Sequence, residues 1–199
     1  MITNKKIKLN ILSLFDGIGC SRLALNQCSN IEVKKYYYSE IDQNCIKLTN
    51  KKFSSDIFLG SVEKINPKIL PKIDLLIGGS PCQDLSNAHK GNGLKGIRSS
   101  LFYRFINLKK TLKPKYFLLE NVKNKWSKVM DKEIGVKGIE LNSMFLSGQF
   151  RKNRCLIDPP SEFFYKYRKL ANYFSIPLLI FSRSLKKKNV LISVNNNCN

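Results

Sequence analysis

The chain has few acidic residues and almost no histidine. Its 199 residues contain 14 Asp and Glu against 35 Lys and Arg, which gives a formal charge of +21, and the one histidine is His89. Soluble enzymes usually carry a more balanced charge. A strongly basic chain suits a polyanionic partner, because Lys and Arg neutralise phosphates. We therefore expect DNA or RNA as a partner, while noting that a Lys- and Asn-rich composition can also reflect coding bias.

Metal-ligand motifs, apolar targeting segments and internal repeats are also missing. The six cysteines include no Cys-x-x-Cys pair, so neither a zinc site nor a disulfide framework is predicted. The N-terminal residues 1–10 are charged with no apolar signal region behind them, and the apolar run 176–181 is too short to span a bilayer. We expect a soluble intracellular protein, cytoplasmic in a prokaryote or phage and nuclear in a eukaryote, with no metal and no membrane partner.

Apolar, β-branched segments alternate with helical patterns, which predicts an α/β fold in one domain. Ser21 is expected to cap a short helix that carries Leu23 and Leu25, and residues 149–154 are expected to form a basic loop. In the second half of the chain, the spacing of Leu101, Phe102, Phe105 and Leu108 predicts a helix with a core-facing side. The strands are expected at residues 7–15, 33–39, 57–59, 74–78, 115–120 and 134–143, and the longer helices at residues 43–53 and 98–112.

One cysteine stands where open α/β folds place their chemistry. Cys82 lies between Pro81 and Gln83 in a loop that directly follows the strand predicted at residues 74–78. A single cysteine is more often an inert small hydrophobic residue than a nucleophile. Here the preceding proline stiffens the backbone, and the glycines of the following segment, residues 91–96, would let it move as a lid. A nucleophilic role for Cys82 is therefore the favoured interpretation.

A glycine turn and an acidic residue mark the ends of the first two predicted strands. Gly17 and Gly19 lie between a strand and a helix, where glycines let the backbone approach a ligand closely. Glu40 follows about twenty residues later, the distance at which a carboxylate commonly binds ribose hydroxyls. Alternatively, Glu40 and Asp42 stabilise the dipole of the helix that follows. Both roles can hold at once.

A second acidic residue ends the strand predicted at residues 115–120. Glu120 is followed by Asn121 and Val122. If this strand pairs in parallel with the strand before the Cys82 loop, their carboxyl ends share one edge of the sheet. We therefore expect Glu120 to lie within reach of Cys82.

These motifs together resemble the DNA (cytosine-5)-methyltransferases, and in particular phage, bacterial and de novo eukaryotic members of that family. The resemblance covers residues 8 to about 155 and depends on the order and approximate spacing of six motifs. They are Phe15-Asp16-Gly17-Ile18-Gly19, Glu40, Pro81-Cys82-Gln83, Arg98-Ser99-x-Leu101-Phe102, Glu120-Asn121-Val122 and Gln149-x-Arg151. The family has a Rossmann-like class I AdoMet-dependent methyltransferase sheet with flanking helices. The resemblance thus implies an AdoMet-binding catalytic domain at residues 1–157, and leaves residues 158–199 as a basic, aromatic tail.

The resemblance implies a covalent mechanism on a cytosine that is flipped out of the duplex. The thiolate of Cys82 would add to C6, C5 would take the methyl group from S-adenosyl-L-methionine (AdoMet), and loss of the C5 proton would release the enzyme. Glu120 would hydrogen-bond N3 and the exocyclic amine of the base. Arg151 would contact the base or the adduct.

On the cofactor side, Phe15 would pack on the adenine, Gly17 and Gly19 would admit the methionine moiety, Glu40 would bind the ribose, and Leu101 would line the pocket. The implied cofactor-binding set is Phe15, Asp16, Gly17, Gly19, Glu40, Ile41, Ser61 and Leu101.

The chain departs from the family pattern at several places. Ser61 stands where members usually carry an acid that contacts the adenine amine, and Asn153 stands where they carry a second arginine, with Arg154 one residue later. No target-recognition region and no closing Gly-Asn element are visible after Cys155. Either the chain is a truncated or frame-disrupted copy, which we favour, or a protein partner completes the site. Besides DNA methylation, methylation of cytosine in tRNA or other RNA and a non-catalytic DNA- or partner-binding remnant remain open.

Overall fold

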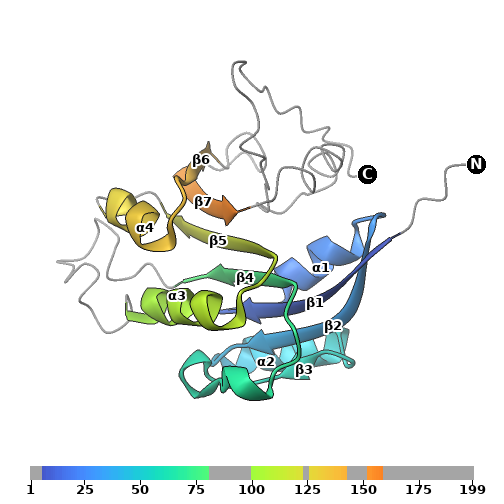
Figure 1. Ribbon diagram of the computed structural model, residues 1–199. Coiled ribbons are helices and arrows are strands. Elements are labelled where there is room, and N and C mark those ends of the chain that lie inside the picture. The colour runs from blue at the N-terminus through green and yellow to red at the C-terminus, as the bar shows by residue number, and fades with distance from the viewer. Residues whose placement is uncertain (1–5, 81–99, 123–125, 143–151, 159–199) are drawn as a thin grey trace, which may run out of the picture.

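The computed structural model describes residues 6–80, 100–122, 126–142 and 152–158. Seven strands form one sheet in the order β3-β2-β1-β4-β5-β7-β6 (Figure 1). The five strands from β3 to β5 in that order run parallel, and β7 runs antiparallel to both of its neighbours. The strands are β1 Ile7–Leu14, β2 Ile31–Ser39, β3 Ile57–Phe58, β4 Leu75–Gly79, β5 Tyr116–Val122, β6 Ile139–Asn142 and β7 Lys152–Asp158.

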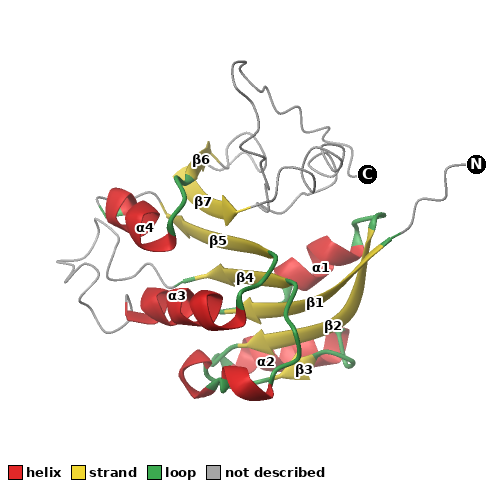
Figure 2. Cartoon of the chain, viewed as in Figure 1, coloured by secondary structure: helices red, strands yellow, loops and turns green. Residues whose placement is uncertain are grey.

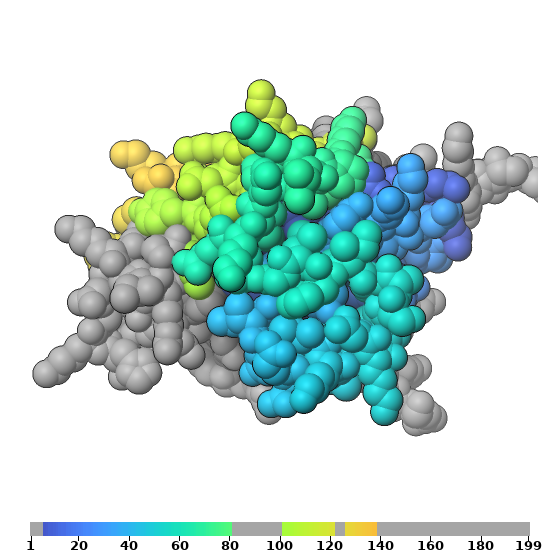
Figure 3. Space-filling model, turned by 90° about the horizontal axis from the view of Figure 1, so that it is seen from below, coloured from blue at the N-terminus to red at the C-terminus, as the bar shows by residue number. Residues whose placement is uncertain are grey.

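Helices cover both faces of this sheet (Figure 2). Arg22 of α1 and Asn50 of α2 approach tyrosines of β2, which puts these two helices on one face. α3 and α4 pack on the opposite face. In a space-filling view from below, the residues of α2, β3 and the 3-10 helices η1 and η2 lie at the surface, and the two 3-10 helices contact α3 (Figure 3). The helices are α1 Cys20–Asn26, α2 Gln43–Lys52, α3 Ser100–Leu112 and α4 Ser127–Ile134, with η1 Val62–Lys64 and η2 Pro67–Ile69.

Two apolar clusters, one on each face, hold the sheet between its helices. Alternate residues of a strand point to opposite faces, so β1 contributes Leu9 and Ile11 to the α1 side and Leu12 and Leu14 to the α3 side. All four side chains are buried. A strand that is apolar on both faces is typical of the centre of a parallel sheet, and β1 lies between β2 and β4.

The strand order places a switch point between β1 and β4. From β1 the chain builds outward through β2 and β3, and it then returns to add β4 and β5 on the other side of β1. Ligands of open α/β sheets bind at the carboxyl ends of the strands beside such a point. A ligand site is therefore expected among the residues that follow β1, β2, β4 and β5.

The expected α/β class is confirmed, and most predicted elements lie within a residue or two of their observed bounds. Glu120 is opposite Gly79 in the parallel pairing of β4 and β5, as expected. The Arg98–Leu112 segment forms α3 from Ser100, and its buried residues include Phe102, Phe105 and Leu108. The proposed boundary after residue 157 stays a prediction, because residues 159–199 lie outside the described residues.

Three local predictions were wrong. The N-cap of α1 is Gly19 in the left-handed conformation, with no side-chain cap, so Ser21 lies inside the helix. The strand predicted at residues 134–143 is shorter, because Ile134 ends α4 and β6 begins at Ile139. Of the predicted basic loop at residues 149–154, the last three residues belong to β7, which pairs with β5 and β6.

Candidate functional site

The turn between β1 and α1 is built from residues in left-handed conformations. Phe15, Gly17 and Gly19 have φ angles of 57°, 59° and 77°. A Cβ on Gly19 would lie 3.1 Å from the ring of Phe53, so only glycine fits there without a shift of that ring. A Cβ on Gly17 would meet no atom of the described residues within 4 Å. With respect to those residues, the backbone at Gly17 is bordered by open space on its Cα side.

The carboxylate of Glu40 links this turn to the end of β2 by hydrogen bonds. Its Oε2 accepts a hydrogen bond of 2.7 Å from the backbone N–H of Gly17. Its Oε1 accepts from the N–H groups of Ile41, at 2.7 Å, and Asp42, at 3.0 Å. Asp42 in turn caps α2, because its Oδ1 accepts from the N–H groups of Asn44 and Cys45. The helix-capping role expected at this position belongs to Asp42, while Glu40 binds the backbone of the glycine turn.

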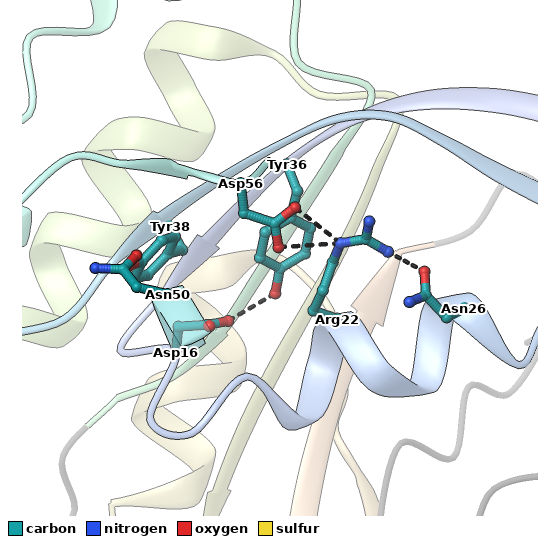
Figure 4. A network of polar contacts seen from close by, with 7 residues as sticks. All are labelled: Asp16, Arg22, Asn26, Tyr36, Tyr38, Asn50 and Asp56. Atoms are coloured by element: carbon teal, nitrogen blue, oxygen red, sulfur yellow. Dashed lines mark hydrogen bonds and ion pairs between the residues drawn. The ribbon is translucent and has the colours of Figure 1, made fainter. Parts of the chain in front are cut away.

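Asp16 is a buried carboxylate beneath the same turn. It is 7% exposed, and its Oδ1 accepts a hydrogen bond of 2.6 Å from the Tyr36 hydroxyl (Figure 4). Burial raises the pKa of Asp16, and the hydrogen bonds from Ser13 and Tyr36 oppose that rise. Its second oxygen, Oδ2, is buried and has no hydrogen-bond partner among the described residues.

A partly buried ion pair lies next to Tyr36. Nε of Arg22 lies 3.1 and 3.0 Å from the two carboxylate oxygens of Asp56. The guanidinium also lies over the rings of Tyr36 and Phe53, at 5.6 and 5.4 Å from the ring centroids, and donates to the Asn26 amide oxygen (Figure 4). Burial raises the pKa of Asp56, and the arginine opposes that shift. The pair links α1 to the segment that leads into β3.

Ser61 and Ile41 lie in the two connections that follow β3 and β2. Ser61 caps η1, with its Oγ accepting from the N–H of Glu63 at 3.4 Å. The preceding Gly60 is in the left-handed conformation, and its carbonyl accepts from the Ser39 hydroxyl at 2.7 Å. Ile41 is 71% exposed, which is unusual for an isoleucine and leaves an apolar side chain in solvent at this edge.

The helix α3 reaches across to the Ser61 connection. Arg104 donates to the carbonyl oxygens of Val62, at 3.0 Å, and Ile65, at 2.5 Å. Leu101, one turn earlier, is partly buried against the apolar cluster of that face. One helix therefore positions both Leu101 and the backbone next to Ser61.

Glu120 and Asn121 lie near the carboxyl end of β5, next to the carboxyl end of β4. A Cβ on Gly79 would lie 3.5 Å from Oε2 of Glu120, so this carboxylate is beside the last residue of β4. The buried Asn121 amide donates to the carbonyl and the hydroxyl oxygens of Ser80, at 3.2 and 2.8 Å. Hydrogen bonds therefore connect the end of β5 to Ser80, the residue before Pro81 and Cys82 in the sequence.

The structure brings together part of the predicted site. Phe15, Asp16, Gly17 and Gly19 share one turn, and Glu40 contacts it directly. Cys82 and Arg151 lie outside the described residues. Four polar residues that hold these positions were not predicted: Arg22, Tyr36, Ser80 and Arg104. No local motif marks them, because each bonds a partner 20 to 42 residues away in sequence.

The described residues hold neither a cluster of metal-ligand side chains nor a membrane-spanning helix. Within the residues that the structure describes, no group of three or more His, Cys, Asp or Glu side chains is arranged to hold a metal ion. Among those same residues, no helix has the length and apolar character needed to cross a membrane.

Comparison with known proteins identifies a family. The model of the C-5 cytosine-specific DNA methylase family matches residues 9–143. An orphan methyltransferase of Bacillus phage rho11s is 42% identical over 118 residues, which are 58% of this chain and 23% of that protein. A type II methyltransferase of Lactococcus lactis subsp. cremoris is 41% identical over 120 residues, which are 60% of this chain and 30% of that protein. The chain thus aligns with less than a third of the length of these two relatives.

The fold also matches a solved structure. A prophage-encoded Escherichia coli protein assigned as a DNA modification methyltransferase superposes with a TM-score of 0.56 at 24% identity, over 75% of this chain and 46% of that one. This similarity supports the predicted Rossmann-like methyltransferase sheet with flanking helices. At this identity it bears on the fold alone.

Proposed function

Because the chain belongs to the C-5 cytosine-specific DNA methylase family, we propose that it transfers a methyl group from AdoMet to C5 of cytosine in DNA. The observation that carries the proposal is the shared edge of the sheet. The glycine turn follows β1, Glu40 follows β2, and Glu120 of β5 lies beside the last residue of β4. All three therefore lie at the carboxyl edge of the parallel strands, on the two sides of the switch point. In this proposal, one site at that edge of the sheet binds AdoMet and the target cytosine side by side.

The described residues fit AdoMet. The space beside the Cα of Gly17 admits the methionine moiety, and the buried, unpartnered Oδ2 of Asp16 offers an acceptor to a donor from outside the described residues. Glu40 uses its oxygens on backbone N–H groups and keeps lone pairs for ribose hydroxyls. The remaining contacts proposed for the cofactor come from Phe15, Gly19, Ile41, Ser61 and Leu101.

In the catalytic step we assign three residues. Cys82 is the nucleophile that adds to C6 of the cytosine. Glu120 hydrogen-bonds N3 and the exocyclic amine, and its place beside Gly79 puts it close to the strand that leads into the Cys82 loop. Arg151 supplies positive charge at the base. When bound, AdoMet supplies the methyl group.

Base-sequence recognition is the part of the activity that the aligned region supports least. The matched segments are 23% and 30% of the two relatives, so most of each relative has no counterpart in the alignment. We propose that residues outside the matched region, or a protein partner, supply target recognition. A DNA substrate also implies an intracellular location.

Methyl transfer from radiolabelled AdoMet tests the proposal. We expect label in duplex DNA, in acid-stable 5-methylcytosine, from the wild-type chain and from a Cys45→Ala control. No label is expected from Cys82→Ala, which should still bind cofactor. Label in tRNA but not in DNA would move the substrate class to RNA. Methylation by Cys82→Ala at the wild-type rate would contradict the mechanism.

A further inference from the structure

The hydrogen bond between Tyr36 and Asp16 joins a buried tyrosine of β2 to the glycine turn. Tyr36 is 2% exposed and its hydroxyl lies 2.6 Å from Oδ1 of Asp16 (Figure 4). The backbone N–H of Asp16 also donates to the carbonyl of Ser39, at 3.1 Å, so both the backbone and the side chain of Asp16 are held by β2. Its orientation is therefore fixed before any ligand arrives.

The environment of Asp16 works against its charge. Burial disfavours the carboxylate, and the acidic side chains of Asp56 and Glu40 add repulsion. The groups that favour the charged form are the hydroxyls of Ser13, from β1, and Tyr36, from β2. Burial and the charge of Asp16 contribute to a raised pKa of Tyr38, whose hydroxyl donates to Asn50, and Arg22 of α1 offsets the charge of Asp56.

One oxygen of the Asp16 carboxylate makes no hydrogen bond to the described residues. Oδ2 of Asp16 is buried and lacks a hydrogen-bond partner among the described residues. A buried charged acceptor without a donor is costly, since most buried polar atoms are hydrogen-bonded. A cationic donor bound to Oδ2 would offset this cost. In AdoMet, the cationic hydrogen-bond donor is the ammonium group of the methionine moiety.

We propose that Tyr36 is a positioning residue that holds the Asp16 carboxylate turned so that Oδ2 accepts a hydrogen bond from the ammonium group of the cofactor. The inference rests on the proposed function, because it takes AdoMet as the ligand. It goes beyond that function by assigning a role to a residue that belongs to none of the motifs described above.

The chain contains a matched control for this role. Tyr38 is 0% exposed, lies on the same face of β2 two residues later, and donates from its hydroxyl to the Asn50 amide at 2.6 Å (Figure 4). Tyr36→Phe and Tyr38→Phe each remove one buried tyrosine hydroxyl from the same strand. Only Tyr36→Phe removes a hydrogen bond that the Asp16 carboxylate accepts.

Calorimetric titration with S-adenosylhomocysteine, which keeps the ammonium group, measures the effect. We expect Tyr36→Phe to raise Kd by about tenfold, as for loss of a hydrogen bond to a charged group, and Tyr38→Phe to change it by less than about twofold. In an Asp16→Asn background, Tyr36→Phe should have almost no further effect, because Tyr36 acts through that carboxylate. For 5′-methylthioadenosine, which lacks the amino-acid portion, Tyr36→Phe should leave Kd unchanged.

The pH profile gives a readout that a merely structural role would not move. Ionised Asp16 binds the ammonium, so affinity is lost as pH falls through the pKa of Asp16. Removing the Tyr36 donor raises that pKa, and the loss in Tyr36→Phe should occur at higher pH than in the wild type or in Tyr38→Phe. Titration of the ligand itself is common to all three proteins and cancels.

The outcomes separate this inference from the proposed function. Wild-type protein that binds S-adenosylhomocysteine, with equal losses in the two tyrosine variants or equal losses for both ligands, would contradict the inference and leave the function standing. Wild-type protein that is folded yet binds neither ligand would contradict both. Variant-specific loss for the ammonium-bearing ligand, with the shifted pH profile, would support the role of Tyr36.

Discussion

At the scale of single residues, Glu40 joins the glycine turn to the connection that follows β2. It accepts from three backbone N–H groups, those of Gly17, Ile41 and Asp42. Glu40→Ala should weaken S-adenosylhomocysteine binding by about tenfold to a hundredfold, because charge-assisted hydrogen bonds that shape the turn are lost. Glu63→Ala, which removes an exposed acid in η1, is the control and should leave Kd unchanged. Equal Kd values for the two variants in a calorimetric titration would show that Glu40 does not shape the cofactor site.

Cys28 offers a test of thiol chemistry in the same chain. Burial raises the pKa of the Cys28 thiol to about 12, and its Sγ donates to the Ala24 carbonyl. A thiol with that pKa is protonated at neutral pH and should react slowly. We expect iodoacetamide at pH about 8 to leave Cys28 unmodified in the native protein and to alkylate it after denaturation. Peptide mass spectrometry measures the site, and rapid native alkylation of Cys28 would contradict the burial described here.

Residue-level prediction from the sequence succeeded where a local pattern carries the chemistry. The two glycines with left-handed φ and the acid at the end of β2 were identifiable because each needs only its own segment. The Tyr36–Asp16 and Arg22–Asp56 contacts were not, since they join side chains 20 and 34 residues apart. Only the assembled sheet makes those pairs neighbours.

Among the structural elements, α3 depends on one small residue in the sheet. A Cβ on Gly78 would lie 3.0 Å from two ring atoms of Phe105, whereas a Cβ on Gly79 would come no closer than 3.5 Å to any described residue, the nearest atom being Oε2 of Glu120. Gly78→Ala should therefore reduce the free energy of unfolding by about 1–3 kcal/mol, as for overpacking in a core. Gly79→Ala should cost less.

Urea denaturation of both glycine variants measures this difference. Neither residue has a positive φ, so backbone strain does not enter the comparison. If Gly79→Ala lost as much stability as Gly78→Ala, contact between Phe105 and the strand would not be the cause.

Elements with a strong apolar period were predicted well, and short or polar ones were not. The helix α4 was missed because its eight residues bury only Ser127, Met130 and Ile134. The left-handed Gly135 that ends it was the available stop signal. β7 contains Lys152, Asn153 and Arg154, so its sequence alone favours a loop. Its pairing with β5 and β6 makes it a strand, since tertiary context outweighs β propensity.

On the scale of the whole molecule, charge dominates the expected interaction with DNA. The chain has a formal charge of +21. Displacement of counterions by Lys and Arg makes DNA affinity fall steeply with salt, and we expect a loss on the order of tenfold or more between about 50 and about 200 mM salt. Fluorescence anisotropy with a labelled duplex measures the slope. Affinity that is independent of salt would mean that phosphate neutralisation does not drive binding.

The central claim is that this chain holds a cytosine-5 methyltransferase site in which Cys82 is the nucleophile. The most direct measurement is incubation of the purified chain with AdoMet and a duplex that contains 5-fluorocytosine, followed by a denaturing gel and peptide mass spectrometry. Fluorine at C5 prevents the final elimination, so the account predicts a covalent DNA adduct on Cys82 that requires AdoMet and is absent from Cys82→Ala. A folded chain that binds both cofactor and duplex yet forms no adduct would contradict it.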